Sequence, residues 1–99
     1  MAYEVRFSES AEGHFARLTA RERSIVTSAV RAQLLHEPVR EMRNRKPLRA
    51  NPLAPWELRA GSLRVFYEVI GEETNIVNIL AIGIKKGNRL FVAGEGIRI

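Results

Sequence analysis

The sequence of 99 residues contains no cysteine, no aspartate and only two histidines. Without cysteine there is no disulfide framework, no thiolate zinc cluster and no cysteine nucleophile, which fits the reducing cytoplasm. Without aspartate there is no Ser-His-Asp triad. His14 and His36 lie far apart, so we expect neither a metal nor another cofactor. No apolar run approaches the ~20 residues of a membrane span, and the first residues do not resemble a signal peptide, so we expect a cytoplasmic protein with no membrane partner.

Positive charge is concentrated in the second part of the chain. The net charge is +5 and the pI is about 10.4, which makes a polyanion such as nucleic acid the first partner to consider. Residues 1–37 carry equal numbers of basic and acidic side chains, whereas residues 38–99 carry eleven basic against six acidic ones. The densest basic stretch consists of Arg40, Arg43, Arg45, Lys46 and Arg49. We interpret this stretch as part of an anion-binding surface, and the alternative is a solvated loop.

The first third of the chain predicts one strand and two helices. Residues 3–7 alternate apolar and polar side chains, which is typical of a strand with one buried face. Ser8 has the position of an N-cap for a short first helix. Thr19 and Glu22 have the spacing of a capping box at the start of a second helix, and we expect Pro38 to end that helix.

The middle of the chain predicts a connector followed by a hairpin. All four prolines lie in residues 38–55, so this segment is expected to be a basic, semi-rigid connector and not a central strand. Residues 56–59 and 63–70 alternate in the way that strands do, and a Gly61-Ser62 turn separates them. This pattern favours a β-hairpin.

A further strand completes the predicted sheet. A second turn at residues 71–74 leads into the nearly continuous apolar run 76–82, which is typical of a central strand. We therefore expect one domain, residues 1–99, of the α+β class, in which a small antiparallel sheet carries two N-terminal helices on one face in the order β-α-α-β-β-β. The pattern does not decide whether the tail, residues 85–99, forms a last strand.

Arginine and lysine are the residues left to carry chemistry. Cleavage of RNA without metal uses the 2′-hydroxyl as nucleophile, and guanidinium groups suit the charge that builds on the phosphate. Arg59 and Arg64 flank the glycine turn, so a hairpin brings them to the same end of the sheet. If the next strand, which ends in Lys85 and Lys86, pairs with the strand of Arg64, all four cations converge on one edge. The alternative is a surface ion pair between Arg59 and a glutamate, Glu57 or Glu68.

Short motifs are spread over nearly the whole chain. They are Tyr3-x-Val5-x-Phe7-Ser8-x-x-Ala11, Phe15-x-x-Leu18, Arg45-Lys46-Pro47-Leu48, Trp56-Glu57-Leu58-Arg59-x-Gly61-x-x-Arg64-Val65-Phe66-Tyr67 and Ile79-x-Ala81-Ile82-Gly83-x-Lys85. Together they resemble the RelE/ParE superfamily of bacterial toxins. The resemblance implies the same small sheet with two helices on one face. It also implies a cognate acidic antitoxin that neutralises the toxin, with a homodimer or a toxin–antitoxin heterotetramer as assemblies.

The resemblance also implies roles for single residues. Arg64 stands at a phosphate-stabilising position of RelE-type enzymes, and Arg59 and Lys85 stand where those enzymes have basic residues. We therefore assign Arg59, Arg64 and Lys85 to a catalytic site. The residues assigned to RNA binding are Arg45, Lys46, Arg49, Lys86 and Arg89. Where the best-understood RelE-type enzymes have two lysines and a proton-transferring tyrosine, this chain has Pro55, Glu57 and Phe91.

The resemblance leaves three functions to compare. RelE-type members are ribosome-dependent mRNA endonucleases, and ParE-type members inhibit DNA gyrase. The leading hypothesis is a RelE-like toxin that inhibits translation by ribosome-associated, metal-independent mRNA cleavage. The alternatives are a ParE-like gyrase inhibitor without nuclease activity, which the missing lysines and tyrosine favour, and a catalytically degenerate toxin that only binds its antitoxin.

Overall fold

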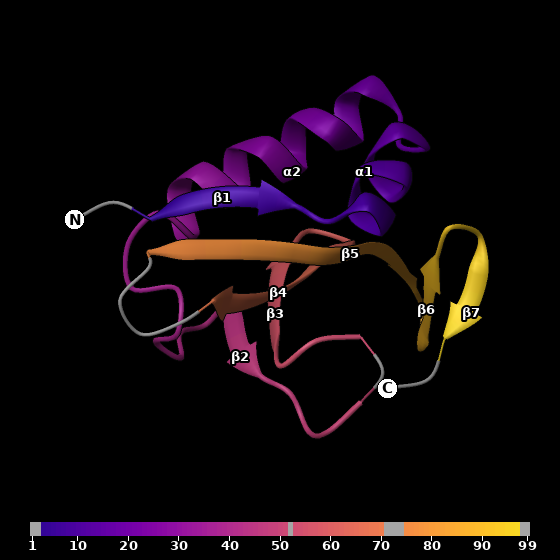
Figure 1. Ribbon diagram of the computed structural model, residues 1–99. Coiled ribbons are helices and arrows are strands. Elements are labelled where there is room, and N and C mark those ends of the chain that lie inside the picture. Colours follow the sequence, from indigo (N-terminus) through magenta and orange to yellow (C-terminus); the bar gives the residue numbers. More distant parts are fainter. Residues whose placement is uncertain (1–2, 52, 71–74, 98–99) are drawn as a thin grey trace.

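The computed structural model describes residues 3–51, 53–70 and 75–97. These residues form two helices and seven strands, in the order β1 (Glu4–Phe7), α1 (Glu9–Ala16), α2 (Ala20–Gln33), β2 (Arg45–Pro47), β3 (Trp56–Ala60), β4 (Leu63–Ile70), β5 (Ile76–Lys86), β6 (Arg89–Val92) and β7 (Glu95–Ile97). Both helices lie on the same side of the sheet (Figure 1). The predicted α+β class is therefore confirmed, and the predicted turn at 71–74 lies outside the described residues.

Both helices begin where the sequence predicts. The Ser8 side chain caps α1 by accepting a hydrogen bond from the Ala11 backbone N–H at 3.1 Å. At the start of α2, Thr19 and Glu22 form both hydrogen bonds of the capping box, at 2.8 and 3.1 Å. Each cap satisfies backbone donors that a helix end would otherwise leave unpaired.

The end of α2 differs from the prediction. The helix ends at Gln33 with Leu34 as its C-cap, several residues before Pro38, so the expectation that Pro38 ends it was wrong. The chain then turns through Glu37, which has a positive φ of 48°. As described below, a buried arginine binds the carbonyl groups of this region, so the helix ends through a long-range contact and not through the proline.

The sheet is larger than predicted, because the connector and the tail both contribute strands. The strands are ordered β2-β3-β4-β5-β6-β7, and all neighbours along this path are antiparallel. The basic connector forms the edge strand β2, where Pro47 is tolerated. The tail forms the β6–β7 hairpin, which projects at one end of the molecule (Figure 1).

Strand β1 departs from the expected antiparallel sheet. It pairs with the first half of β5 in parallel, with Glu4 opposite Ile76 and Phe7 opposite Ile79. The second half of β5 pairs with β6 instead, starting at Gly83. Between the two halves, the β4–β5 register shifts by one residue, which is typical of a β-bulge.

The two faces of the sheet pack differently. The main core lies between the sheet and the helices and includes Val26 of α2 and its C-cap residue Leu34, which pack with Leu58 and Ile79 of the sheet. Tyr67 is buried in this core, and its hydroxyl donates a hydrogen bond to the Pro38 carbonyl at 2.6 Å. A smaller apolar cluster on the opposite face consists of Ala54, Phe66, Ala81, Leu90 and Val92, with Leu48, Leu53 and Leu80 against it. We call this opposite side the helix-free face.

Neither of the described helices has the length and apolar character that crossing a membrane requires.

Candidate functional site

Charged side chains gather on the helix-free face at the end of the sheet where β3 and β4 turn. Side chains of directly opposed residues in antiparallel strands lie on the same face. Lys46 of β2 is opposite Glu57 of β3, and Arg59 of β3 is opposite Arg64 of β4. Arg64 is in turn opposite Gly83 of β5, and the alternation of side chains along β5 places Lys85 on this same face. The set Lys46, Glu57, Arg59, Arg64 and Lys85 is referred to below as the sheet cluster.

Glu57 is the centre of the sheet cluster. It is 6% exposed, although it is a carboxylate on a basic protein. Its Oε1 lies 3.2 Å from Nε of Arg64 and 3.4 Å from Nε of Arg59. A buried charge is tolerated only when it is paired, and here two cations pair with one anion. Glu57 therefore lies between the two arginines as their shared partner.

Arg64 is held at several points. Its Nη1 donates hydrogen bonds to the carbonyls of Gly61 at 2.7 Å and Leu63 at 2.9 Å, and its side chain is 11% exposed. Burial and the neighbouring Arg59 lower the pKa of Arg64, whereas Glu57 opposes that shift. The Arg59 side chain is 42% exposed, so Arg59 is the more accessible of the two guanidinium groups. Lys85 lies beside the turn that joins β3 to β4, since its backbone N–H donates to the Ser62 carbonyl at 2.7 Å.

The predicted proximity of Arg59 and Arg64 is therefore confirmed, and the alternative of an ion pair between Arg59 and Glu57 is also present. What the sequence reasoning missed is that Glu57 is buried and contacts both arginines. A signal was available, because Glu57 and Arg59 are two residues apart on a predicted strand and must lie on one face. Glu57 thus belongs to the site and is more than a departure from a family pattern.

Arg45 has a different position from the one predicted, because its guanidinium is buried. It is 4% exposed and donates hydrogen bonds to the carbonyls of Gln33 at 2.7 Å, Glu37 at 2.9 Å and His36 at 3.4 Å, with Met42 also in contact. These carbonyls lie at and beyond the C-terminal end of α2, where a cation is favourable. The guanidinium of Arg45 is therefore not exposed in the way that the predicted RNA binding requires, because it closes the end of the helix.

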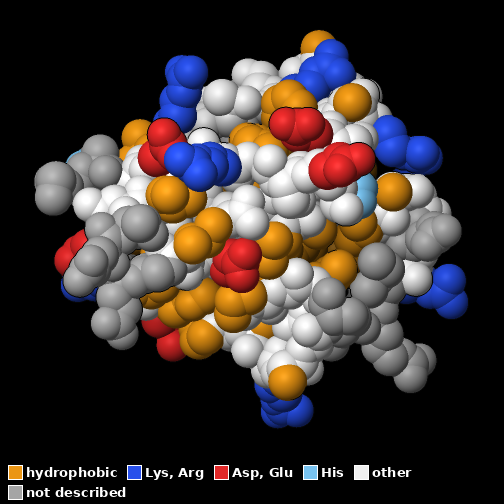
Figure 2. Space-filling view, viewed as in Figure 1, with side chains coloured by type: hydrophobic (Ala, Val, Ile, Leu, Met, Phe, Trp, Pro, Cys, Tyr) orange, Lys and Arg blue, Asp and Glu red, His pale blue; other side chains and the backbone are white. Residues whose placement is uncertain are grey.

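The convergence of all four predicted cations on one edge is also wrong. Strand β5 continues through Lys86, so Lys85 and Lys86 point to opposite faces of the sheet. Lys86 is opposite Arg89 on β6, and both are exposed. Arg49 is exposed on the loop after β2. In the view of Figure 2 the basic side chains lie at separate places around the outline of the molecule and form no continuous patch on this side.

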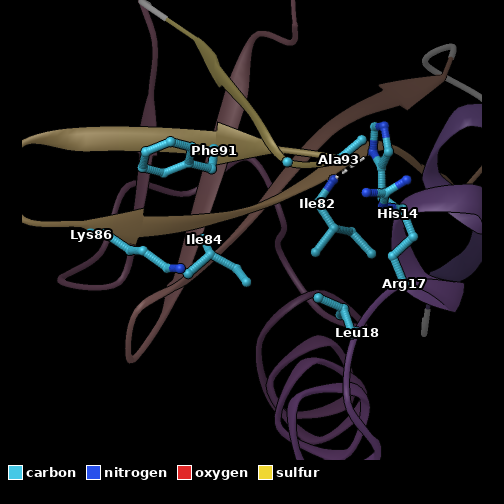
Figure 3. A pocket seen from close by; sticks show the side chains of 9 residues that line it. His14, Arg17, Leu18, Ile82, Ile84, Lys86, Phe91 and Ala93 are labelled. Atoms are coloured by element: carbon cyan, nitrogen blue, oxygen red, sulfur yellow. Dashed lines mark hydrogen bonds between the residues drawn. The ribbon is translucent and has the colours of Figure 1, made fainter.

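A cavity of about 370 Å³ lies on the helix side of the sheet, between α1 and strands β5 and β6. Figure 3 shows His14 of α1 and its C-cap residue Arg17 on one side of the cavity and Lys86 and Phe91 on the other, with Ile82 and Ile84 between them. His14 Nδ1 accepts a hydrogen bond from the Ile82 N–H at 3.2 Å. The Lys86 Nζ lies 5.9 Å from the centre of the Phe91 ring. This cavity and the sheet cluster are therefore on opposite faces.

No protein-family model matches the sequence, and no curated protein matches it significantly. The chain is similar in structure to the toxin–antitoxin complex RelBE2 from Mycobacterium tuberculosis, with a TM-score of 0.71 and 28% identity, covering 86% of this chain and 100% of that one. The chain has a RelE-like toxin fold. It is also similar to an arginine-to-alanine double mutant of the E. coli toxin RelE in the free state, with a TM-score of 0.63 and 28% identity, covering 85% of this chain and 84% of that one.

A third structure of this kind is an archaeal RelE–RelB complex from Pyrococcus horikoshii, with a TM-score of 0.63 and 21% identity, covering 83% of this chain and 93% of that one. At this identity the likeness concerns the fold alone. The two similarities at 28% identity support a toxin of a toxin–antitoxin system. The RelE-like fold is thus reached both from the motifs and from the structure.

Within this RelE-like fold, Phe91 is separated from the sheet cluster. Phe91 is opposite Ile84 on β5 and lines the cavity on the helix side, whereas Arg64 lies on the helix-free face. A phenyl ring carries no titratable proton. The groups that can move a proton near Arg59 and Arg64 must therefore come from the sheet cluster itself.

His14 gives the folded protein a pH-dependent stability. Burial, and to a lesser extent Arg17, lowers the pKa of His14 below its ordinary value of 6.5. Between the lowered and the ordinary value the unfolded chain binds more protons, so stability rises with pH across this window. We expect the melting temperature to fall on acidification from about pH 7.5 to about pH 5, and to fall less in His14→Gln. His36→Gln, at an exposed histidine, is the control, and an equal fall in His14→Gln and the wild type would contradict this expectation.

Proposed function

We propose that the chain is the toxin of a toxin–antitoxin system and that it inhibits translation by cleaving mRNA on the ribosome, in the cytoplasm, without a metal ion. The observation that carries the proposal is the pair of opposed arginines, Arg59 and Arg64, held around a buried Glu57 on a face that no helix covers. A phosphodiester beside them would meet guanidinium groups that are already fixed in place. Such preorganised charge is what stabilises a phosphate that gains negative charge during cleavage.

The division of labour within the sheet cluster follows from exposure. Arg59 is the accessible guanidinium and is assigned to bind the scissile phosphate. Arg64 is fixed by two backbone carbonyls, and its more deeply buried positive charge is assigned to stabilise the same phosphate. The exposed Lys85 beside the turn and the half-buried Lys46 on the edge strand are assigned to neighbouring phosphates, since lysines bind phosphates as point charges.

The proposed partner is a cognate acidic antitoxin. The net charge of +5 favours an acidic partner, because complementary charge speeds association and excludes wrong partners. The chain also exposes large apolar side chains, including Ile25 on α2 and Val39 and Met42 in the loop after it. A partner that covers these side chains removes apolar surface from water, and this stabilises the complex.

The test of this function is expression of the chain without its antitoxin, followed by primer extension on a translated mRNA. We expect growth arrest and new mRNA ends inside codons. In the double variant Arg59→Ala/Lys85→Ala the ends should become at least tenfold weaker, since two phosphate contacts are lost. The matched control is Arg21→Ala/Arg31→Ala, which removes the same charge from exposed positions on α2.

Three results would overturn the proposal. Growth arrest without new mRNA ends would show that the toxin acts on a different target, for which inhibition of DNA supercoiling by the purified protein is the next measurement. Equal cleavage by the double variant and by its control would show that the sheet cluster is not the site. Binding of purified antitoxin without any growth arrest by the free chain would show a degenerate toxin.

A further inference from the structure

Glu57 is more than a partner for the arginines. Its two ion pairs, with Arg59 at 3.4 Å and Arg64 at 3.2 Å, are both measured at Oε1. Arg64 does not depend on Glu57 for its position, because the carbonyls of Gly61 and Leu63 already hold it. Burial of a carboxylate is costly, and Arg64 does not need this one for its position. We therefore expect Glu57 to have a further role.

The charges around Glu57 suit a second anion. The charged groups nearest to it are Lys46, directly opposite on β2, Arg59 on its own strand and Arg64 on β4, and Lys85 lies further along the same face, at the end of β5. All four are cations, so the carboxylate leaves the cluster with an excess of positive charge. A phosphodiester can therefore lie beside Arg59, on the same face as Glu57. This arrangement places a proton acceptor next to the proposed phosphate site.

We propose that Glu57 is the general base that takes the proton of the 2′-hydroxyl in RNA cleavage, a proposal that rests on the function proposed above. As Glu57 takes this proton, the 2′ oxygen forms a bond to phosphorus and the bond from phosphorus to the 5′ oxygen breaks. The leaving 5′ oxygen takes a proton from water, and the resulting hydroxide takes the proton from Glu57. The products are a 2′,3′-cyclic phosphate and a 5′-hydroxyl, and the carboxylate is restored.

This assignment fits the groups available on the helix-free face. Phe91 cannot accept a proton and lies on the other side of the sheet. Arginine stays protonated in proteins and cannot act as a base. Glu68 is on the same face but pairs with Asn78, far along β4 from the turn. This leaves Glu57 as the carboxylate of the sheet cluster that can accept the proton.

The test measures cleavage of mRNA on purified translating ribosomes by the wild type, Glu57→Gln and Glu57→Asp. Glutamine keeps the shape and the hydrogen-bonding oxygen but accepts no proton at neutral pH. We expect Glu57→Gln to cleave about 100-fold more slowly, as removal of a general base does, with its ribosome binding within about twofold of the wild type. Glu57→Asp should recover part of the rate. The matched control, Glu68→Gln, should cleave at the wild-type rate.

The pH dependence separates a base from a structural carboxylate. We expect the wild-type cleavage rate to fall on acidification, as it does for a reaction that needs a general base, and this acidic limb to be absent from the residual rate of Glu57→Gln. Equal rates and equal profiles for the two proteins would overturn the proposal. A slow Glu57→Gln that has also lost ribosome binding or melts at a lower temperature would overturn it too, in favour of a structural role. If the wild type produces no cleavage at all, it is the proposed function that fails, and this inference fails with it.

Discussion

Replacing Arg45 with alanine is expected to destabilise the folded protein by about 3 kcal/mol. The guanidinium is 4% exposed and donates to three carbonyls at and beyond the end of α2, two of them at 2.7 and 2.9 Å. A hydrogen bond to a charged group contributes about 1.5–3 kcal/mol, and a buried acceptor left unpaired costs about 1–3 kcal/mol. The loss of two such bonds together accounts for the expected value. Unfolding in urea, followed by the fluorescence of Trp56, measures it.

Arg43→Ala is the matched control for Arg45→Ala. Arg43 is two residues away, is exposed, and carries the same charge. Its removal should change the free energy of unfolding by less than about 0.5 kcal/mol, as is usual for exposed positions. If the two variants were equally stable, the closure of α2 by Arg45 would be wrong.

Gly83→Ala should destabilise the protein by about 2 kcal/mol, because strand β6 approaches too closely for any side chain at this position. An added Cβ would lie 2.9 Å from both the Leu90 Cδ1 and the Phe91 carbonyl oxygen, and 3.0 Å from the Val92 Cγ2. A backbone oxygen cannot rotate away, so strand β6 itself has to shift. Overpacking of this kind costs about 1–3 kcal/mol.

The same substitution elsewhere in the chain should have the opposite effect. Gly13 lies inside α1, and a Cβ added there would meet nothing within 4 Å. Gly13→Ala should stabilise the protein by about 0.5–1 kcal/mol, because alanine loses less conformational freedom than glycine in a helix. Melting temperatures of the two variants should therefore move in opposite directions. A stabilised Gly83→Ala would refute the close approach of β6.

Local patterns predicted those parts of the fold that local interactions determine. Both helix caps, at Ser8 and Thr19, depend on residues three positions away, and the spacing alone predicts them. The pairing of Arg59 with Arg64 likewise follows from one short turn. In the same way, the alternation of side chains along β3 predicts that Glu57 lies on the same face as Arg59. It does not predict that Glu57 is buried.

The parts that the sequence did not predict depend on contacts between distant residues. Arg45 reads as one more basic residue in a loop, and only the docking of β2 beside α2 makes its guanidinium a helix cap. The sequence predicts a basic turn at Lys85 and Lys86. In the structure, pairing with β6 extends β5 through both residues, so their side chains point to opposite faces of the sheet. The parallel pairing of β1 with β5 has no local signal either, because its two strands lie at opposite ends of the chain.

That parallel pair sets the order of events when the protein is made. The Ser8 hydroxyl bonds to the Leu80 carbonyl across 72 residues, at the point where β1 ends beside β5. At roughly 5–20 residues per second, a ribosome needs roughly 4–14 s to synthesise the stretch between them. Until β5 has emerged, β1 lacks its hydrogen-bonding partner and the arginines of β3 and β4 have only half of a sheet behind them. The sheet that carries the sheet cluster is therefore completed only near the end of synthesis, because β5 pairs with both β1 and β4.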